Sequence, residues 1–261
     1  MDFRGAIVKA RRLNKQMKIN SVRISSVQKA IVYLCLLFPF VLSLRVLAAD
    51  AAANVSAEER SPFDLTGTWV SIVSEDWRVR MLMGQKGDWL FMMGRYGSLN
   101  RRGLDEASSA DPLAADPCMA YGAAGIMRIP GRVRISWSSG DVLKLEFDAG
   151  NQVRDLYFGS SNIASGNTVQ GFSKAVFNDS QLFVETTNLL PGYYFKHGVP
   201  YSDQAELSEI FTVLEDGEAD YLFVTTTVKD PVYLNGYYDR TLTFKREADD
   251  SKWNPEACSV P

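Results

Sequence analysis

The only histidine of the 261-residue chain, His197, lies in a stretch rich in aromatic residues, proline and glycine, LLPGYYFKHGVPYS. An imidazole gains and loses a proton near neutral pH, so a histidine in an enclosed site can act as a general acid or base. Tyr193, Tyr194 and Tyr201 flank it and offer rings and hydroxyl groups to an organic ligand. Two interpretations stay open: His197 moves a proton or contacts a ligand, or it is one exposed loop residue.

A second unusual run is SEDWRVRM, which crowds acidic, aromatic and basic side chains into residues 74–81. Alternate residues of a strand share a face, which places Asp76, Arg78 and Arg80 together. Facing the interior, these side chains and Trp77 would hold a carboxylate or a polar head group. Facing water, they would only protect a strand edge from aggregation. The same choice applies to a further set of polar residues: Arg128, Asp148, Gln152 and Arg154.

Standard catalytic and metal-binding motifs are absent from the sequence. Zinc and copper sites need several His or Cys ligands, so a single histidine disfavours them, and we predict neither a metal nor an organic cofactor. The sequence also contains no Gly-rich phosphate loop, Cys-x-x-Cys pair, Gly-x-Ser-x-Gly or zinc-protease helix motif. Most standard hydrolase and nucleotide-binding classes are therefore disfavoured.

Residues 1–48 have the pattern of a secretory signal peptide. Eight basic residues precede a fifteen-residue apolar run from Ala30 to Leu44, and small residues follow at cleavage spacing. The run is short for a transmembrane helix and contains Pro39. We therefore expect the protein to be exported, either to the periplasm or into the medium. The alternative is an anchor formed by an uncleaved N-terminal segment, which the charge of Arg45 near the cleavage site favours.

Without this segment the chain is strongly acidic. The whole chain has 28 Lys+Arg and 31 Asp+Glu residues, of which nine bases and one acid lie in residues 1–48. The remaining 19 bases and 30 acids give residues 49–261 a net charge of −11. Nucleic acids and anionic lipids repel such a protein. We expect no nucleic-acid partner, and membrane contact only through the signal segment.

The cysteine pattern agrees with export. Cys35 lies in the apolar run, which leaves Cys118 and Cys258 in the mature chain. In an oxidising compartment two such residues form a disulfide, which here would tie the C-terminal tail to the body of the protein and contribute about 4 kcal/mol. Two buried free thiols are the alternative.

Alternation of apolar and polar residues predicts strands along most of the chain. In RVRISW (132–137) and VLKLEFD (142–148) every second residue is apolar, and the turn SSGD between them predicts a hairpin. The same pattern continues through QVRDLYF, VQGFSKAVF, QLFVETTNLL, ELSEIFTVLE, YLFVTTTVK and RTLTFKR, after LTGTWVSIVS and DWLFMM at the front. Only residues 104–127 leave room for a short helix.

These strands predict an all-β fold. Because no helices alternate with the strands, a parallel sheet is excluded. Short turns between sequential strands favour one antiparallel meander barrel of about eight to ten strands, since closure removes exposed edges. A two-sheet β-sandwich is the alternative. We expect a disordered lead-in over residues 49–62 and a single barrel domain over residues 63–261.

The stretch DLTGTW at residues 64–69 resembles the start of lipocalin-like (calycin) barrels, in which a Gly-x-Trp motif opens the first long strand. The resemblance implies that Trp69 closes one end of the barrel and that a cation from the last strand packs over its ring. Gly67 and Trp69 match the motif, and Arg240 is our candidate for the cation, with Lys245 and Arg246 as alternatives. Stretches such as GIMRIPGRVRISW are also similar to exported bacterial proteins without an assigned function.

Three functions are consistent with these observations. The first is a binding protein that holds a small, largely apolar or amphiphilic molecule in the barrel, with Trp77, Arg78, Arg80, Tyr193 and Tyr194 around it. The second is a cofactor-independent isomerase, dehydratase or cyclase, in which His197 or Asp76 moves a proton and Arg78 stabilises negative charge. The third is a structural envelope protein whose barrel contains no cavity.

Overall fold

The computed structural model describes residues 55–75, 98–159 and 162–260, and Ser56–Pro261 form one compact unit. Its strands are β1 (Gly67–Ser71), β2 (Arg132–Ser139), β3 (Val142–Phe147), β4 (Ala149–Gly150), β5 (Gln152–Phe158), β6 (Phe172–Asn178), β7 (Gln181–Thr187), β8 (Gly192–Phe195), β9 (Val199–Tyr201), β10 (Glu206–Glu215), β11 (Asp220–Lys229), β12 (Tyr237–Arg246) and β13 (Glu256–Ala257). Its helical segments are η1 (Val73–Glu75), α5 (Arg101–Ser109), η2 (Pro117–Tyr121) and α6 (Ala123–Ile126).

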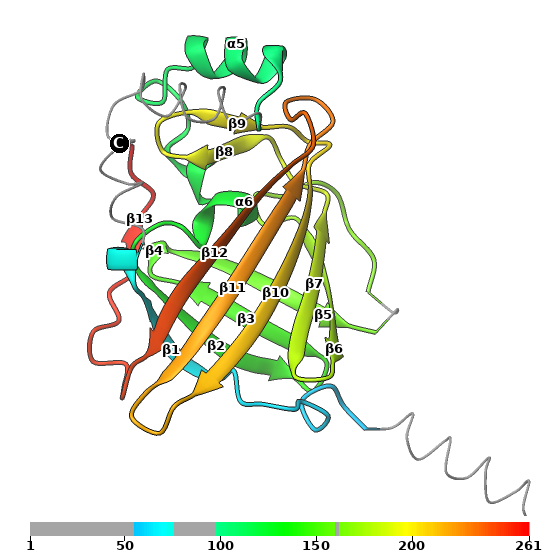
Figure 1. Ribbon diagram of the computed structural model, residues 1–261, viewed down its shortest axis with the longest axis vertical. Helices are drawn as coiled ribbons and strands as arrows, with labels where there is room; N and C mark the ends of the chain where they lie inside the picture. Colours follow the sequence, from blue (N-terminus) through cyan, green and yellow to red (C-terminus); the bar gives the residue numbers. More distant parts are fainter. Residues whose placement is uncertain (1–54, 76–97, 160–161, 261) are drawn as a thin grey trace, which may run out of the picture. The chain divides into compact units, whose positions relative to one another are not determined.

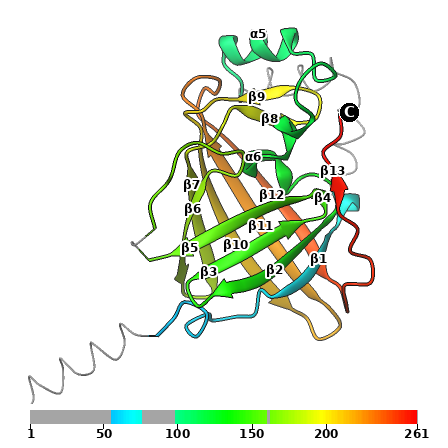
Figure 2. The same ribbon diagram turned by 180° about the vertical axis from the view of Figure 1, so that it is seen from behind.

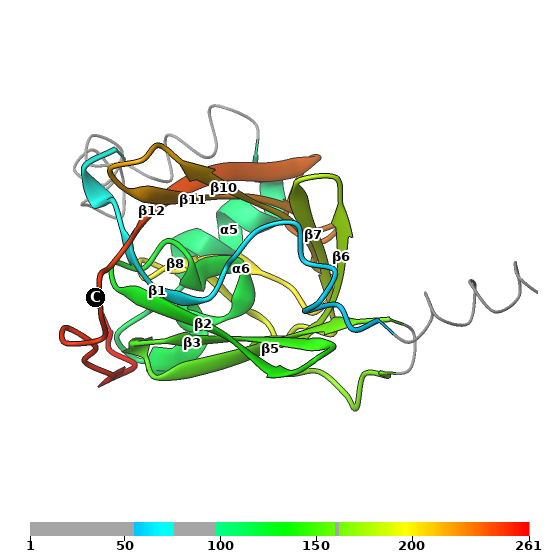
Figure 3. The same ribbon diagram turned by 90° about the horizontal axis from the view of Figure 1, so that it is seen from below.

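Nine strands close into a barrel in the order β1-β12-β11-β10-β7-β6-β5-β3-β2 (Figures 1 and 3). The all-β barrel predicted from the sequence is therefore confirmed, and the sandwich is not formed. One neighbouring pair departs from the expected antiparallel meander: β5 and β6 are parallel. Residues 162–171 run back along the barrel before β6, so β5 and β6 start at the same end (Figure 2).

Alternation along the strands decides which side chains enter the barrel. In β3, Leu143 and Leu145 are buried while their neighbours remain partly exposed, and they lie opposite Trp137 and Ile135 of β2. The predicted hairpin of residues 132–148 is thus confirmed. Its inner face is apolar and its outer face carries charges, including the Arg134–Glu146 ion pair at 3.2 Å.

The interior is solid at the lower end of the barrel, where β1 pairs with the end of β12 (Figure 1). Trp69, Leu145, Phe211 and Val224 are all 0 % exposed, so no water-sized space adjoins their side chains. Aromatic side chains also pack at this end of the barrel, such as the stacked rings of Phe158 and Phe177, whose centroids lie 5.0 Å apart. A core of this density has no room for a ligand.

The Gly-x-Trp motif has the structural role that the resemblance implies, but its cation is Arg246. Trp69 and Arg246 are direct partners in the β1–β12 register, and the guanidinium carbon lies 4.1 Å from the ring centroid. Gly67 has φ +108°, and a Cβ there would lie 3.2 Å from Arg246, so a glycine leaves space for the guanidinium. Arg240, our first candidate, instead pairs with Thr226 further up β12.

The opposite end is covered by a cap, which we define as residues 98–131, 188–205 and 230–236. It contains α5, η2, α6 and the β8–β9 hairpin (Figure 1). A second apolar cluster fills the cap and includes Leu99, Tyr194 and Val199, together with Leu207 and Val228 from the barrel strands. Since barrel and cap residues share this cluster, the cap is packed directly on the strand ends. The region in which we expected a short helix forms part of it.

The C-terminal tail, residues 247–260, lies along the outside of the barrel and ends at the cap. Glu247 forms an ion pair with Arg132 at 2.7 Å, and β13 pairs in parallel with β4. The predicted Cys118–Cys258 disulfide is present and joins the tail to η2. The tail therefore connects the lower end of β12 covalently to the cap.

Residues 56–62, which we expected to be disordered, contact the barrel instead. Ala57 is 1 % exposed, and its backbone N–H donates to an Oδ1 of Asp141 at 2.8 Å. Ser56 and Glu59 form a reciprocal pair in which the Glu59 carboxylate accepts from the Ser56 N–H and the Ser56 hydroxyl accepts from the Glu59 N–H. This Ser-x-x-Glu capping box, visible in the sequence, orders the segment locally.

Candidate functional site at the capped end

Polar side chains enter the barrel just below the cap. Arg154 of β5 is 2 % exposed and Glu209 of β10 is 1 % exposed, and a charge-assisted hydrogen bond joins them. Nε of Arg154 also donates to Ser173 of β6 at 2.9 Å, and Nη2 donates to Thr186 of β7 at 2.7 Å. Arg154 thus connects four strands from inside the barrel. We call these side chains and Thr226 the polar belt.

The strand register places the belt in two adjacent inward rows, because Thr186 lies opposite Leu207 whereas Glu209 lies opposite Val184. Ser173 lies directly opposite Thr186, and Glu209 lies directly opposite Thr226. Thr226 in turn faces Arg240 of β12, which occupies an inward position in the strand alternation. Burial lowers the pKa of the Arg240 guanidinium below its usual value. Because burying charge costs free energy unless it is paired, a belt of this kind needs a structural or a functional reason.

Arg154 keeps one donor without an acceptor. Its Nη1 atom is buried and has no hydrogen-bond partner in the described part of the chain, whereas Nε and Nη2 are engaged. A buried donor left unsatisfied costs about 1–3 kcal/mol. Such a group in a native protein usually has a water or a ligand as its partner.

Two tyrosines, Tyr194 of the cap and Tyr238 of the barrel strand β12, repeat this feature. The rings of Tyr194 in β8 and Tyr238 in β12 lie 5.3 Å apart, and the ring of Tyr201 lies 5.4 Å from that of Tyr194. The hydroxyl oxygens of Tyr194 and Tyr238 are buried, and neither has a hydrogen-bond partner among the described residues. Burial raises the pKa of Tyr194 well above its usual value and that of Tyr238 to about 12. Both hydroxyls therefore keep their protons and act as donors.

Arg128 is an electrostatic neighbour of both Tyr238 and His197. The Arg128 guanidinium lies 4.4 Å from the ring centroid of Phe195, and the Phe195 ring contacts Tyr238 edge-on at 6.1 Å. Burial, and secondly the charge of Arg128, lower the pKa of His197 below its usual 6.5. The imidazole is therefore neutral at physiological pH and can accept a proton. We call Arg128, Tyr194, Phe195, His197 and Tyr238 the cap cluster.

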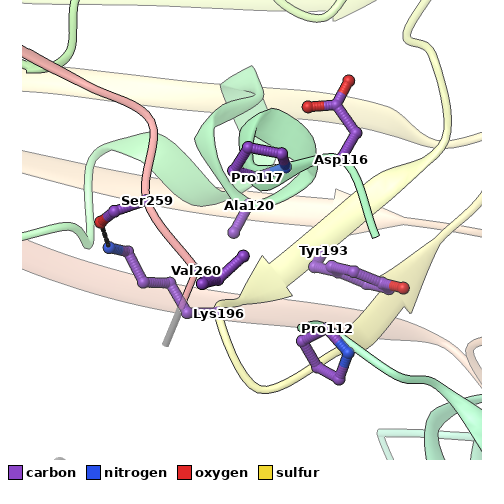
Figure 4. A pocket seen from close by; sticks show the side chains of 8 residues that line it. All are labelled: Pro112, Asp116, Pro117, Ala120, Tyr193, Lys196, Ser259 and Val260. Atoms are coloured by element: carbon purple, nitrogen blue, oxygen red, sulfur yellow. Dashed lines mark hydrogen bonds between the residues drawn. The ribbon is translucent and has the colours of Figure 1, made fainter. Parts of the chain in front are cut away.

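The structure separates the two tyrosines that we predicted to act together. Tyr194 faces the barrel, while Tyr193, its neighbour in β8, lines a small pocket of about 10 Å³ on the outside of the cap (Figure 4). Proline, alanine and valine side chains form much of that pocket, and Lys196 at its rim bonds to Ser259 at 2.9 Å. Tyr193 is thus not part of the cap cluster.

Other predicted site residues have structural roles or cannot be placed. Asp148 accepts from the Arg132 backbone N–H at 2.6 Å and serves the turn after β3. The run containing Asp76, Trp77, Arg78 and Arg80 lies outside the described residues, as does the expected strand DWLFMM. Its charged face remains a prediction.

Neither a metal centre nor a membrane helix emerges from the described residues. No group of three or more His, Cys, Asp or Glu side chains in this part of the chain is arranged to hold a metal ion. Of the helices in the described ranges, none is long and apolar enough to cross a bilayer.

Comparison with known proteins leaves the chemistry of the site as the main guide to function. No family model, no curated protein and no solved structure matches the chain. The closed barrel is compatible with a lipocalin-like architecture. A fold alone assigns neither a ligand nor a reaction.

Sequence reasoning missed most of the polar belt. Glu209 occupies an inward position between the apolar residues Leu207 and Phe211, so a charge in an apolar slot of ELSEIFTVLE was the available signal. Arg154 occupies an inward position between Gln152 and Leu156, so only one of its inward neighbours is apolar. Tyr238 gave no such signal, because tyrosine is common on both faces of strands.

Proposed function

We propose that this protein is exported and that the capped end of its barrel binds a small amphiphilic organic molecule. The observation that carries the proposal is the pair of buried hydroxyls of Tyr194 and Tyr238, which have no partner in the described structure. They are donors beside the aromatic rings of Tyr201 and Phe195. Ligand sites combine an apolar lining with a few polar groups that fix orientation.

The packing favours this end of the barrel over the other. At the lower end the fully buried side chains that face the interior are apolar, such as Phe211 and Val224. The capped end instead offers rings for an apolar skeleton and donors for a polar group. Because the two hydroxyls are buried, a ligand reaches them when the β8–β9 hairpin moves away from Tyr238.

The first test is native mass spectrometry of the protein purified from the envelope of its own host, followed by organic extraction. We expect one amphiphilic molecule per chain. Tyr194→Ala should abolish the adduct, whereas Leu222→Ala, which truncates a packed side chain at the lower end, should retain it. Protein that is free of adduct in every preparation, and whose melting temperature no amphiphile raises, would contradict the proposal.

A second candidate is a proton-transfer enzyme acting at the same place. The lowered pKa of His197 next to Arg128 supports it, since a neutral imidazole can abstract a proton while a guanidinium stabilises the resulting negative charge. His197→Gln separates the two functions. In an enzyme the variant keeps its affinity for the extracted ligand but loses its turnover, whereas in a binding protein no turnover exists to lose.

A further inference from the structure

A cleft lies at the lower end of the barrel, where the residues before β1 cross below the strands (Figure 3). Its volume is about 440 Å³, and its walls are formed by Trp137 of β2 and by residues of the segment 58–66. Glu58 and Asp64 of this segment are exposed, so the cleft is open to solvent. None of the lining residues belongs to the cap cluster or to the polar belt. We call it the lower cleft.

Two aromatic rings of the lower cleft are held in place from behind. The ring of Trp137 packs against that of Phe158 with centroids 5.4 Å apart, and the ring of Phe63 contacts Phe177 edge-on at 5.8 Å. Phe158 and Phe177 stack on each other. These four linked rings fix the aromatic walls before any ligand arrives. The faces of such rings attract cations.

The acidic wall is positioned by backbone hydrogen bonds. The Glu58 N–H donates to the Gly140 carbonyl at 2.9 Å, and the N–H of Ala57 donates to the Asp141 carboxylate at 2.8 Å. Gly140 and Asp141 form the turn that follows β2, the strand that carries Trp137. The backbone of Glu58 is therefore held at the end of the strand whose indole lines the cleft.

The two carboxylates of the lower cleft differ in how far they are already engaged. Asp64 lies 3.8 Å from Arg246, which shares its charge. The Glu58 side chain has neither a hydrogen bond nor an ion pair with any residue in the described ranges. No lysine or arginine lines the cleft, and Arg60 directs its Nε to the Ser56 carbonyl at 3.2 Å. The negative charge of Glu58 thus remains available to a cation.

We propose that the lower cleft binds a small organic ammonium ion, with its charge next to Glu58 and its carbon groups against Trp137 and Phe63. The ring faces and the carboxylate both attract positive charge, and the rings also remove the attached carbon groups from water. The excess of acids over bases in residues 49–261 favours the approach of a cation. The cleft is separate from the capped end, so this inference is independent of the proposed function.

The test compares ammonium ions with neutral molecules of similar shape. Choline and its uncharged carbon analogue, and benzylammonium and benzyl alcohol, are titrated into the purified protein at low ionic strength while the indole N–H signals are followed by NMR. At least one ion should bind about five to ten times more tightly than its neutral counterpart. It should shift the signal of Trp137 and leave that of the buried Trp69 in place. A neutral molecule that binds as tightly as its ion, or no binding by either ion, would overturn the proposal.

A charge variant tests the role of the carboxylate. Glu58→Gln keeps the shape of an exposed side chain and should weaken ion binding about two- to fivefold, the effect of one exposed ion pair. Binding of the neutral counterpart should not change. Glu106→Gln is the matched control, because it removes the same charge from an exposed position on α5, at the capped end. Equal weakening in both variants would mean that only the overall charge attracts the ion, and the assignment of Glu58 would be wrong.

A ring variant tests the aromatic wall and also assigns the Trp137 signal. Trp137→Phe keeps an aromatic side chain against Phe158 but offers the weaker ring, so ion binding should fall about two- to threefold. Trp253→Phe is the control, because the ring of Trp253 contacts Arg134 and does not line the cleft. Ion binding that is unaltered in Trp137→Phe would show that the ion does not contact this ring, which would contradict the proposal.

Discussion

Apolar atoms fill the lower end of the barrel around Trp69 and Phe211, whereas at the capped end Arg154, Glu209 and Tyr194 bring charge and hydroxyl groups to the inner face of the same strands. At the lower end the indole N–H of Trp69 donates to the Leu65 carbonyl at 2.9 Å. At the capped end several buried polar atoms, among them Tyr194 Oη, Tyr238 Oη and Gln170 Oε1, have no hydrogen-bond partner in the described structure. One sheet thus has an apolar, tightly packed end and an end where buried polar atoms can still form hydrogen bonds. Binding sites often have such unpaired polar atoms.

The largest loss of stability should follow from removing the Trp69 side chain at the lower end. Trp69→Ala removes a fully buried indole and the support of Arg246, and should lower the free energy of unfolding by about 3–5 kcal/mol. Urea denaturation followed by circular dichroism measures the change. Val176→Ala, at a side chain that is 58 % exposed on the outer face of β6, is the control and should change stability by less than about 0.5 kcal/mol. A similar loss in both variants would show that the lower end is not tightly packed.

A comparable loss should follow from unbalancing the polar belt. Glu209→Gln leaves the buried Arg154 cation without its counter-charge and should cost about 3–5 kcal/mol. The same denaturation experiment on the double variant Arg154→Met/Glu209→Leu should recover most of this loss. If the single variant were as stable as the original protein, the pair would not be a buried ion pair in solution.

The disulfide tests whether the cap depends on the tail. Cys118→Ser/Cys258→Ser should lower the free energy of unfolding by about 2–4 kcal/mol, since a long closed loop is released in the unfolded chain. Hydrogen exchange should increase first in η2 and β13 and least in the packed end. Uniform exchange along the chain would mean that the cap and the lower end unfold together.

The smallest effect concerns pH and the cap cluster. Because the pKa of His197 is lower in the folded protein than its usual 6.5, the unfolded chain binds more protons below that pH. The stability contribution of the neutral imidazole is therefore complete above pH 6.5 and declines as the pH falls. Melting temperatures measured between about pH 7.5 and 5 should fall less in His197→Gln than in the original protein. If the melting temperatures of both proteins changed equally with pH, His197 would be exposed to solvent.

The sequence was most informative where one face of a strand is uniform. Leu143 and Leu145 alternate with charged residues, so hairpin, barrel class and disulfide could be predicted from pattern and compartment. The parallel β5–β6 pair could not, because strand direction depends on the path of residues 159–171 and not on alternation. The polar belt depends on four strands meeting at Arg154, and such a meeting has no local signature.

The first and last barrel strands are neighbours, with Trp69 opposite Arg246. The ring therefore cannot close until almost the whole chain has been synthesised, and its closing contacts join residues far apart in sequence. Long-range contacts of this kind slow folding. A chain that folds late stays extended for longer, which is the state that a secretion channel accepts. For the export that we propose, the placement of β12 beside β1 would keep the chain unfolded during translocation.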